Sequence, residues 1–444
     1  MFSYYLKLGV RSLRRNPALT ALMVITLAIG VAASVSTLTI LHVMASNPIP
    51  QKSERLFVPV LDNGPLKGFN PADVANRAEH HSGNDQLTYT DAINLLKTGY
   101  GERRTALYGI SGSIEPARRE LPVITAQGVA ATRDFFAMFD VPFLYGQRWS
   151  EQDDKVGADV VVLNREMAEK LFGAINPVGR RLRMNGQDYQ VVGVMDNYRP
   201  RPKFYRLVGG PGAFGEEEDV LVPLSNAIAR QLAANGTMNC QGKRDPGWQG
   251  LLDSDCLWLQ FFFETRRASE RAELQSWLDH YTSEQRRLGR FPRAAPNRLF
   301  DVMEWLAYQK VVANDSRLAA WLAFGFLALC LVNTVGLLLA KFSVRAAEVG
   351  IRRALGASRR EIFQQFLVET AVVGLAGGLL GVLLAFGALA IIALQSQEMQ
   401  TVAHMDLPML ALTFVLALLA ALLAGLVPTW RACQITPAIQ LKSQ

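Results

Sequence analysis

The stretch Ala18–Met44 reads ALTALMVITLAIGVAASVSTLTILHVM and contains no Asp, Glu, Lys or Arg. A helix that rises about 1.5 Å per residue needs roughly 20 apolar residues to cross a hydrocarbon core of about 30 Å. A cleaved secretory signal is the alternative for an apolar run behind a basic N-terminus, but its apolar region is only about 7–15 residues long. We therefore interpret residues 18–45 as an uncleaved transmembrane helix.

Three further uncharged apolar runs lie toward the C-terminal end, at residues 318–340, 370–394 and 407–430. These runs explain why the 444 residues are 50% hydrophobic and only 19% charged, with a mean hydropathy of +0.13. A soluble domain usually carries about a quarter charged residues. The sequence predicts an α+β membrane protein with four transmembrane helices and a large outer α+β domain, residues 46–317, between the first and second helices.

The basic residues indicate the orientation. Of the 46 Lys and Arg residues, twelve lie in segments 1–17, 341–369 and 431–444, whereas the short loop 395–406 carries acids only. Because basic loops stay in the cytoplasm, both termini are predicted to be cytoplasmic. Residues 1–17 are predicted to form an amphipathic helix on the lipid surface. The outer region then holds 34 basic and 34 acidic residues, so the net charge of +7 reflects orientation and does not indicate nucleic-acid binding.

Local patterns predict several elements in the outer domain. Val160–Leu163 is a β-branched run that leads through Asn164, a candidate N-cap, into a helix over 165–172 closed by Gly173. Residues 179–184 and 189–194 flank Asn185-Gly186, a strong hairpin signal. Residues 219–223 read as a strand, 197–215 as an irregular loop, and 200–256 as an insertion.

A helix is predicted from about Ser269 to Arg287, and another from about Asn297. Because no Pro or Gly occurs between Asn297 and Phe324, we expect this last helix to continue into the second transmembrane helix as a stiff lever. The alternative is a separate helix with a bend near Asn314–Ser316.

Two of the four cysteines, Cys240 and Cys256, lie in the outer domain, whereas Cys330 is intramembrane and Cys433 cytosolic. An oxidising compartment allows a disulfide between the outer pair. Two unpaired thiols are the alternative.

The sequence predicts no catalytic residue and no metal site. It lacks the G-x-x-x-x-G-K-[ST] motif of a P-loop, and its five histidines form no H-E-x-x-H pair. Gly210–Gly215 spells G-x-G-x-x-G, but acids and a strand follow it where a dinucleotide fold needs a helix. The acidic clusters Asp153-Asp154 and Glu216–Asp219 are interpreted as solvated turns. The apolar runs carry no charge, which disfavours ion-coupled transport.

The cytoplasmic segment 341–369, which we call the elbow, is the most informative part of the sequence. Within VRAAEVGIRRALGASRREIFQQFLVE, Val344, Ala347, Ile351 and Leu355 share one helical face, and Arg345, Arg352 and Arg353 lie largely on the other. Gly356 is placed to end this helix in a left-handed cap. Ser358 and Glu361 then form a capping box for the next helix. We interpret the corner, with its small residues and basic rim, as a docking site; a helix lying on anionic lipid is the alternative.

Small residues repeat along the third apolar run. Gly374, Gly377, Gly378 and Gly381 form two overlapping small-x-x-x-small pairs, which permit close contact between helices. The contact lies either within one subunit or between two.

The segment Glu348–Ser358, EVGIRRALGAS, closely resembles the signature of the MacB/FtsX-type ABC transporter permeases. The similarity covers nearly the whole chain and includes Gly9–Pro17, Leu171–Gly173, Asn176–Arg180, Val191–Val194, Pro428–Ala432 and Thr436–Ala438. It implies a porter-like module with an inserted subdomain, in a permease of the bacterial inner membrane that dimerises with a second copy or a paralogue.

The resemblance also implies an ABC ATPase that docks beneath the elbow and binds ATP and Mg, so that this chain itself holds no cofactor. MacB-type pumps carry that ATPase on the same chain, whereas here we expect a separate subunit. The docking residues carried over from the resemblance are Glu348, Gly350, Arg352, Arg353, Leu355, Gly356, Ala357 and Ser358. A periplasmic adaptor and an outer-membrane channel are further candidate partners, and segment 200–256 matches no pattern that assigns its contacts.

The expected function is therefore that of a non-catalytic transporter subunit, which passes ATP-driven motion to its periplasmic domain for efflux or export of an envelope substrate. The alternative is an FtsX-like regulatory protein that activates a cell-wall hydrolase or senses a peptide. A membrane-anchored enzyme would require turnover by the 46–317 fragment.

Overall fold

The computed structural model describes residues 16–61, 85–116, 122–208, 210, 212–240, 242–292 and 297–395, together with 411, 415, 418, 419, 422, 425, 426 and 430. Residues 1–15 of the predicted helix 1–17, residues 396–406 of the loop 395–406, most of the fourth apolar run and the tail 431–444 lie outside these described residues. The chain divides into a helical unit, Met1–Met44 with Val312–Gln444, and an α+β unit, Ala45–Val311. Each unit is described by itself.

A ten-stranded mixed sheet is the centre of the α+β unit. Its strands are β1 Leu56–Val60, β2 Arg103–Glu115, β3 Ile124–Ala131, β4 Phe143–Gly146, β5 Val160–Leu163, β6 Arg181–Met184, β7 Gln187–Met195, β8 Val220–Pro223, β9 Gln260–Glu264 and β10 Arg298–Asp301.

Helices lie between the strands in sequence. They are α4 Tyr89–Lys97, α5 Asp134–Met138, α6 Glu151–Val156, α7 Arg165–Phe172, α8 Leu224–Ala229, α9 Gly247–Leu252, α10 Arg271–Arg287 and α11 Val302–Tyr308, with 3₁₀ turns at Phe204–Arg206 and Ala268–Glu270.

The strand order is β10-β1-β9-β2-β3-β8-β5-β7-β4. The β3–β8 and β5–β7 pairs are parallel and the other pairs are antiparallel. Strand β6 pairs with β7 and also with the end of β2. Strands β2, β3, β8, β5, β7 and β6 therefore form a closed circuit of hydrogen-bonded neighbours, which leaves β10 and β4 as outer strands.

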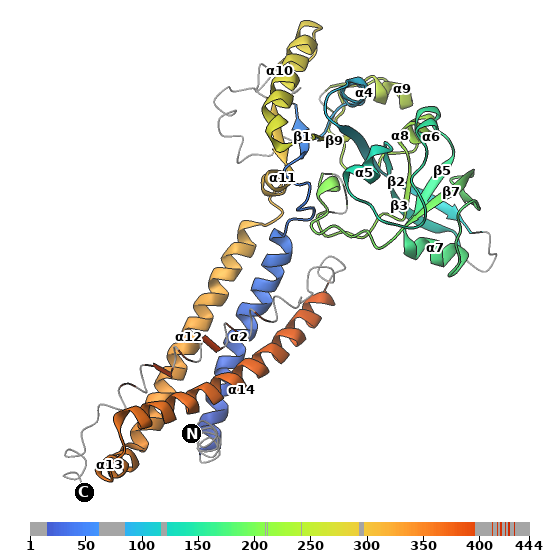
Figure 1. The fold of residues 1–444 in the computed structure, drawn as a ribbon. Coiled ribbons are helices and arrows are strands. Elements are labelled where there is room, and N and C mark those ends of the chain that lie inside the picture. Colours follow the sequence, from blue (N-terminus) through green and yellow to red (C-terminus); the bar gives the residue numbers. More distant parts are fainter. Residues whose placement is uncertain are drawn as a thin grey trace. The chain divides into compact units, whose positions relative to one another are not determined.

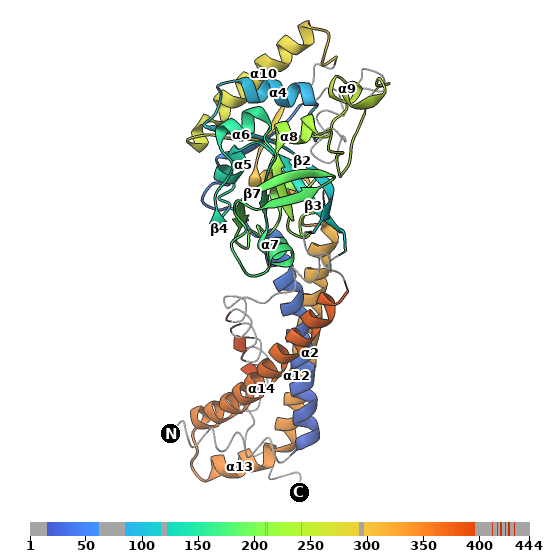
Figure 2. The same cartoon turned by 90° about the vertical axis from the view of Figure 1, so that its right-hand side faces the viewer.

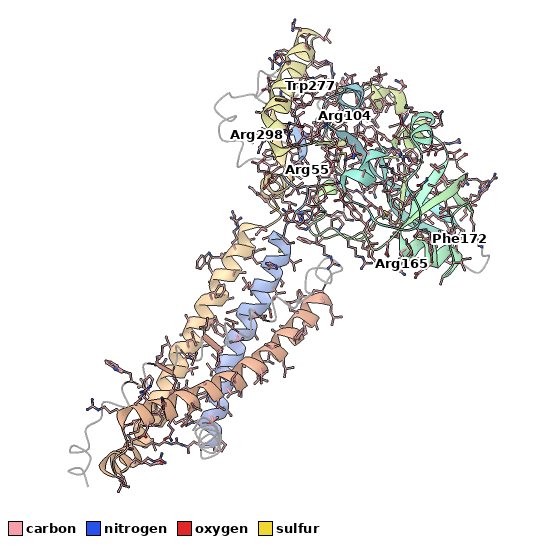
Figure 3. All side chains as sticks on the ribbon, in the orientation of Figure 1. Arg55, Arg104, Arg165, Phe172, Trp277 and Arg298 are labelled. Atoms are coloured by element: carbon pink, nitrogen blue, oxygen red, sulfur yellow. A yellow bond between two sulfur atoms is a disulfide. The ribbon has the colours of Figure 1, made fainter. Side chains whose placement is uncertain are left out.

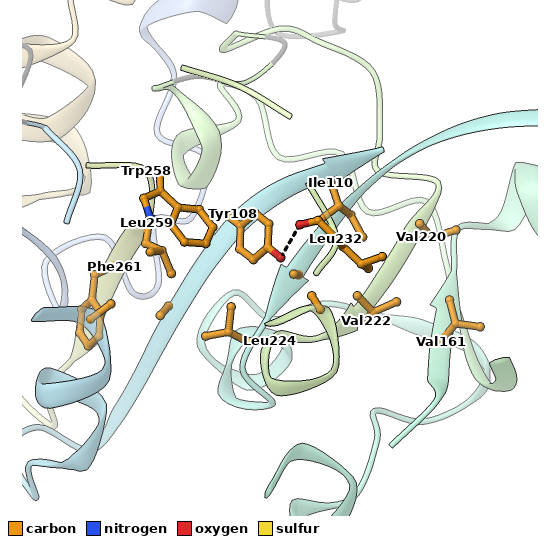
Figure 4. Close-up of a cluster of buried hydrophobic side chains, with 14 of the residues drawn as sticks. Tyr108, Ile110, Val161, Val220, Val222, Leu224, Leu232, Trp258, Leu259 and Phe261 are labelled. Atoms are coloured by element: carbon orange, nitrogen blue, oxygen red, sulfur yellow. Dashed lines mark hydrogen bonds between the residues drawn. The ribbon is translucent and has the colours of Figure 1, made fainter. Parts of the chain in front are cut away.

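Alternate residues of the strands feed two apolar clusters, as the two-residue period of a strand requires. Tyr108, Val222 and Phe261 belong to one cluster, which also receives α4, α7 and α10. The intervening Leu107 and Phe262 belong to the other, with α5 and α11. Figure 4 shows part of the first cluster, where the Tyr108 hydroxyl donates to the Leu232 carbonyl oxygen at 3.0 Å.

Elements that depend on local sequence signals are confirmed. Strand β5, the Asn164 cap and α7 lie where the sequence places them, and the Asn164 side chain accepts from the Met167 amide. Asn185 and Gly186 both have positive φ, 51° and 76°, which is the conformation of the tight β6–β7 hairpin.

The expected lever helix is wrong. Residues 298–301 pair with β1 instead of forming a helix, and Asp301 caps the separate helix α11. Lys310, with φ 52°, follows α11, and α12 begins only at Asn314. The alternative of a separate helix is therefore the correct one.

The predicted inserted subdomain is also corrected. Segment 200–256 contributes β8, which pairs with β3 and β5 inside the sheet, so it belongs to the body of the α+β unit. A disulfide joins Cys240 and Cys256 beside the bridge between Asn239 and Leu257.

The helical unit contains α2 Pro17–Ala45, α12 Asn314–Val344, α13 Ala346–Ala354 and α14 Arg359–Ala393. Among the described residues, α2, α12 and α14 are long and apolar enough to cross a membrane. The fourth span stays a prediction, although its residue Gly425 lies against Thr370 of α14 with no room for a Cβ atom. Helices α2 and α12 run side by side in both views (Figures 1 and 2).

The glycines of α14 contact the same chain. A Cβ atom on Gly377 would lie 2.9 Å from Leu27, and one on Gly381 would lie 2.9 Å from Val31, both on α2. Gly374 and Gly378 are buried as well. These contacts fit the within-subunit alternative, because small residues let α14 approach α2 closely.

Candidate functional site: the elbow

The elbow is a sharp corner between α13 and α14. Helix α13 ends at Ala354, and Gly356 has a φ of 101°, the left-handed conformation that favours glycine. The Ser358 hydroxyl accepts from the Glu361 amide at 3.2 Å, and the Glu361 carboxylate accepts from the Ser358 amide at 2.9 Å. The predicted glycine stop and capping box are confirmed.

An apolar cluster fixes α13 against its neighbours. Val349 of α13 is buried in a cluster to which α2, α12 and α14 also contribute. The Phe342 and Phe366 rings, from α12 and α14, have centroids 4.3 Å apart. Only a recess of about 20 Å³ remains between α13 and α14, which is room for about one water molecule. The corner is therefore closely packed.

Polar contacts add a second link between α13 and α14. Arg352 donates to the Gln365 side-chain oxygen at 3.0 Å and to Glu348 at 2.7 Å. These side chains are half-buried. Arg352 therefore links α13 to α14 through Gln365, while Glu348 of α13 holds its guanidinium group.

A buried group of charges lies where α12 and α14 meet. The Glu369 carboxylate has its two oxygens 2.5 Å from Lys341 Nζ and 3.2 Å from an Arg345 nitrogen. The sequence did not predict that these three side chains meet. The three residues lie directly beyond the ends of two apolar runs, which the short elbow joins. From this arrangement in the sequence, the ion pairs could have been predicted.

Exposed apolar side chains lie on and beside α13. Ile351 of α13 is 63% exposed, Val344 at the end of α12 is 79% exposed, and Leu355 directly after α13 is 83% exposed. Arg345 and Arg352 are half-buried, whereas Ile351 and Leu355 are exposed, and the two arginines form ion pairs with Glu369 and Glu348. Arg359 and Arg360 are exposed basic residues at the corner.

The remaining predicted docking residues lie along the same corner. Gly356 and Ser358 are exposed, Gly350 and Ala357 are half-buried, and Arg353 belongs to α13, its side chain lying outside the described part. The structure thus brings the eight predicted residues together on one short segment; their contact with an ATPase stays a prediction.

A groove of about 250 Å³ lies between α7 and the β6–β7 hairpin of the α+β unit. Leu171, Phe172, Leu182, Arg181 and Arg183 are among the residues that line it. Figure 3 shows Phe172 and Arg165 on α7. Within the described ranges, no three His, Cys, Asp or Glu side chains gather as metal ligands.

The sequence predicts that the acidic cluster Glu216–Asp219 is a solvated turn, but this is wrong for Glu218. Glu218 is buried and forms ion pairs with Lys203 at 3.1 Å and Arg206 at 3.5 Å, while the Tyr205 hydroxyl donates to it at 2.6 Å. Although burial disfavours the charged form, these partners hold the pKa of Glu218 below its ordinary value. The cluster is structural.

A mixed-sheet domain inserted between apolar helices, with a capped helical corner after the second of them, defines a membrane permease. The chain matches the family described as MacB-like periplasmic core domain over residues 20–275, and the FtsX-like permease C-terminal family over 320–437. It therefore belongs to the MacB/FtsX-type ABC permeases.

Two relatives show how far the similarity extends. The macrolide export ATP-binding/permease protein MacB of Marinobacter nauticus is 25% identical over 99% of this chain and 60% of its own length. The pyoverdine export ATP-binding/permease protein PvdT of Pseudomonas aeruginosa is 24% identical over 70% of this chain and 41% of its own. The chain spans about a third to three fifths of the length of such relatives.

Among solved structures, the periplasmic region of MacB from Actinobacillus actinomycetemcomitans aligns with a TM-score of 0.35 and 15% identity. The alignment covers 58% of this chain and 94% of that one.

Proposed function

We propose that this chain is a permease subunit of an ABC transporter in the bacterial inner membrane, with both termini in the cytoplasm. A separate ATPase subunit binds ATP and Mg and docks on the elbow. Its motion changes the conformation of the α+β unit in the periplasm, which drives export of an envelope substrate. The permease works as a dimer, with a second copy or a paralogue; an adaptor and an outer-membrane channel are further proposed partners.

The elbow is the observation that carries this proposal. Its α13 helix carries the exposed Ile351, with exposed Leu355 directly after it, and is held against α12 and α14 by the buried Val349 and by the Arg352–Gln365 hydrogen bond. A partner that binds the outward face would therefore displace two transmembrane helices together, since close-packed elements transmit displacement instead of absorbing it.

Two further observations support the export reading. The relatives named above are ATP-binding/permease proteins for export of macrolides and of pyoverdine. The Cys240–Cys256 disulfide suits an oxidising compartment such as the periplasm. Residues 1–444 contain no P-loop motif.

Co-purification tests the docking step. The permease is co-expressed with a candidate ABC ATPase subunit from the same genome, and Leu355→Glu is compared with the wild type. A carboxylate at this exposed position should not disturb folding. It should abolish ATPase binding, because removing a charge from water at an apolar interface costs free energy. The matched control is Leu288→Glu, 74% exposed in the α+β unit, which should bind normally.

Binding of the ATPase by Leu355→Glu at the wild-type level would refute docking on this face. If instead the variant loses only its association with anionic vesicles and keeps the ATPase, α13 is a lipid-surface helix.

An FtsX-like regulatory role is the second candidate, and the match of residues 320–437 to the FtsX-like C-terminal family favours it. The same elbow would then act on a protein regulator bound to the α+β unit. A strain lacking the gene distinguishes the two: export predicts accumulation of a substrate, whereas regulation predicts altered cell-wall hydrolysis without accumulation.

A further inference from the structure

Three charged side chains meet in a dry position at the base of the elbow, and we call them the charge clamp: Lys341, Arg345 and Glu369. The side chains of Lys341 and Glu369 are 0% and 1% exposed, and that of Arg345 is 13% exposed. Glu369 comes from α14, Lys341 from the last turn of α12, and Arg345 from the residue that follows α12. The clamp therefore links the helices on both sides of α13.

Burial makes the geometry of these charges strict. Removing a carboxylate or an ammonium group from water costs free energy unless its ion-pair partner stays in place. Only a small range of positions of α12 against α14 is therefore favourable. Such ion pairs often add little to net stability compared with apolar side chains of similar size. These ion pairs therefore matter here because they determine the position of α12 relative to α14.

Neighbouring contacts fix the same register. Phe342 follows Lys341 directly, and its ring contacts that of Phe366, which precedes Glu369 by about one helical turn. The ring contact holds the helices together, and the ion pairs specify how they slide and rotate. The Glu348–Arg352 pair cannot serve this purpose equally well, because both side chains are about 40% exposed and water screens their attraction.

We infer that Glu369 is a positioning residue for coupling: through Lys341 and Arg345 it locks α12 to α14, so that a displacement of α13 moves both helices as one body. This inference rests on the proposed function. Without the clamp, the ATPase would still bind the exposed face of α13, but part of its motion would be lost as sliding between α12 and α14.

The first test is the distance between the two helices. Nitroxide labels are attached to cysteines at Ser343 and Gln364, exposed positions on α12 and α14, with Cys330 and Cys433 replaced by serine. We expect a narrow distance distribution in the wild type and a broad one in Glu369→Gln, which removes the carboxylate that pairs with Lys341 and Arg345. The control Glu348→Gln should stay narrow, because the Glu348–Arg352 pair is not part of the clamp.

The second test is transmission in the complex with the ATPase. Hydrogen–deuterium exchange of the α+β unit is compared with and without ATP and vanadate. The wild type should show an ATP-dependent difference, whereas Glu369→Gln should retain the bound ATPase and lose that difference. If the wild-type complex shows no such difference, the proposed function fails and the clamp with it.

Other outcomes concern the clamp alone. If Glu369→Gln responds to ATP like the wild type and keeps a narrow distance, the inference is overturned while the proposed function stands. If Glu369→Gln fails to accumulate, Lys341→Met/Glu369→Leu takes its place, because it removes the two most deeply buried charges of the clamp together. We expect this variant to bind the ATPase with a broad distance and no ATP response; a wild-type response would again overturn the inference.

Discussion

Individual buried charges organise both units of this permease. In the α+β unit Glu218 lies between Lys203 and Arg206, and in the helical unit Glu369 lies between Lys341 and Arg345. In each case one carboxylate pairs with two cations, so its removal takes the opposite charge from both. The carboxylate is therefore the sensitive member of each group.

At Glu218 the expected consequence is a loss of stability. Glu218→Gln removes the charge but keeps the shape, and we expect it to lower the free energy of unfolding by about 3–5 kcal/mol, as for other broken buried pairs. The measurement is thermal unfolding of the purified chain in detergent, followed by tryptophan fluorescence. Glu169→Gln, whose salt bridge to Arg165 is about half exposed, is the control and should cost less than about 1 kcal/mol.

The same carboxylate predicts an acid limit to stability. Because folding lowers the pKa of Glu218, its contribution is present above the unfolded-state pKa and is lost as the pH falls through the folded-state pKa. We expect the wild type to lose stability below about pH 4, the ordinary range of a glutamate. The free energy of unfolding of Glu218→Gln should fall less steeply with decreasing pH in this acid range. An equal dependence on pH in the two proteins would contradict the role assigned to Glu218.

At the scale of elements, the sequence predicted what local chemistry determines. The Asn164 cap, the Asn185-Gly186 turn and the Ser358–Glu361 capping box each depend on residues within a few positions, and each is confirmed. The strand at 298–301 was not predicted, because it forms only by pairing with β1, which lies far away in the sequence.

The orientation of α13 shows a second limit of sequence reasoning. Helical periodicity identified two faces but could not decide which one turns inward. Val349 lies on neither predicted face, yet it is buried, and the arginines beside it find acid or amide partners on α13 and α14. The choice depends on those tertiary contacts, as does the charge clamp.

The contact between α14 and α2 gives a prediction with a matched control in the same helix. A Cβ atom at Gly381 would lie 2.9 Å from Val31 and 3.1 Å from the Ala28 carbonyl oxygen, whereas none lies within 4 Å at Gly387. We expect Gly381→Leu to cost about 1–3 kcal/mol through overpacking and Gly387→Leu to cost little. Thermal unfolding in detergent measures both. Equal effects of the two substitutions would show that α14 does not pack on α2 through Gly381.

At the scale of the whole molecule, the chain passes between the two units twice, at Met44–Ala45 and at Val311–Val312. Inside the α+β unit these two connections lead to neighbouring strands, because β1 and β10 pair from Phe57↔Asp301 to Val60↔Arg298. Ile49, Trp305 and Leu306 join the same apolar cluster beside them. Both connections therefore enter the sheet at its β10 edge, where a displacement would act on two paired strands together.

If motion is transmitted through these two chain connections, a flexible insertion in one of them should weaken the transmission. We expect Gly-Gly-Ser inserted between Val311 and Val312 to leave ATPase binding intact and to reduce the ATP-dependent change in hydrogen exchange of the α+β unit, because a flexible linker does not transmit displacement. The control is the same insertion between Lys243 and Arg244, an exposed position inside the α+β unit, which should respond like the wild type.

An undiminished response with the first insertion would show that the second chain connection is not needed for transmission. A lost response in both variants would point to a general effect of insertion, because the second site lies away from the connections. Only loss at Val311–Val312 alone identifies that connection as part of the mechanical path.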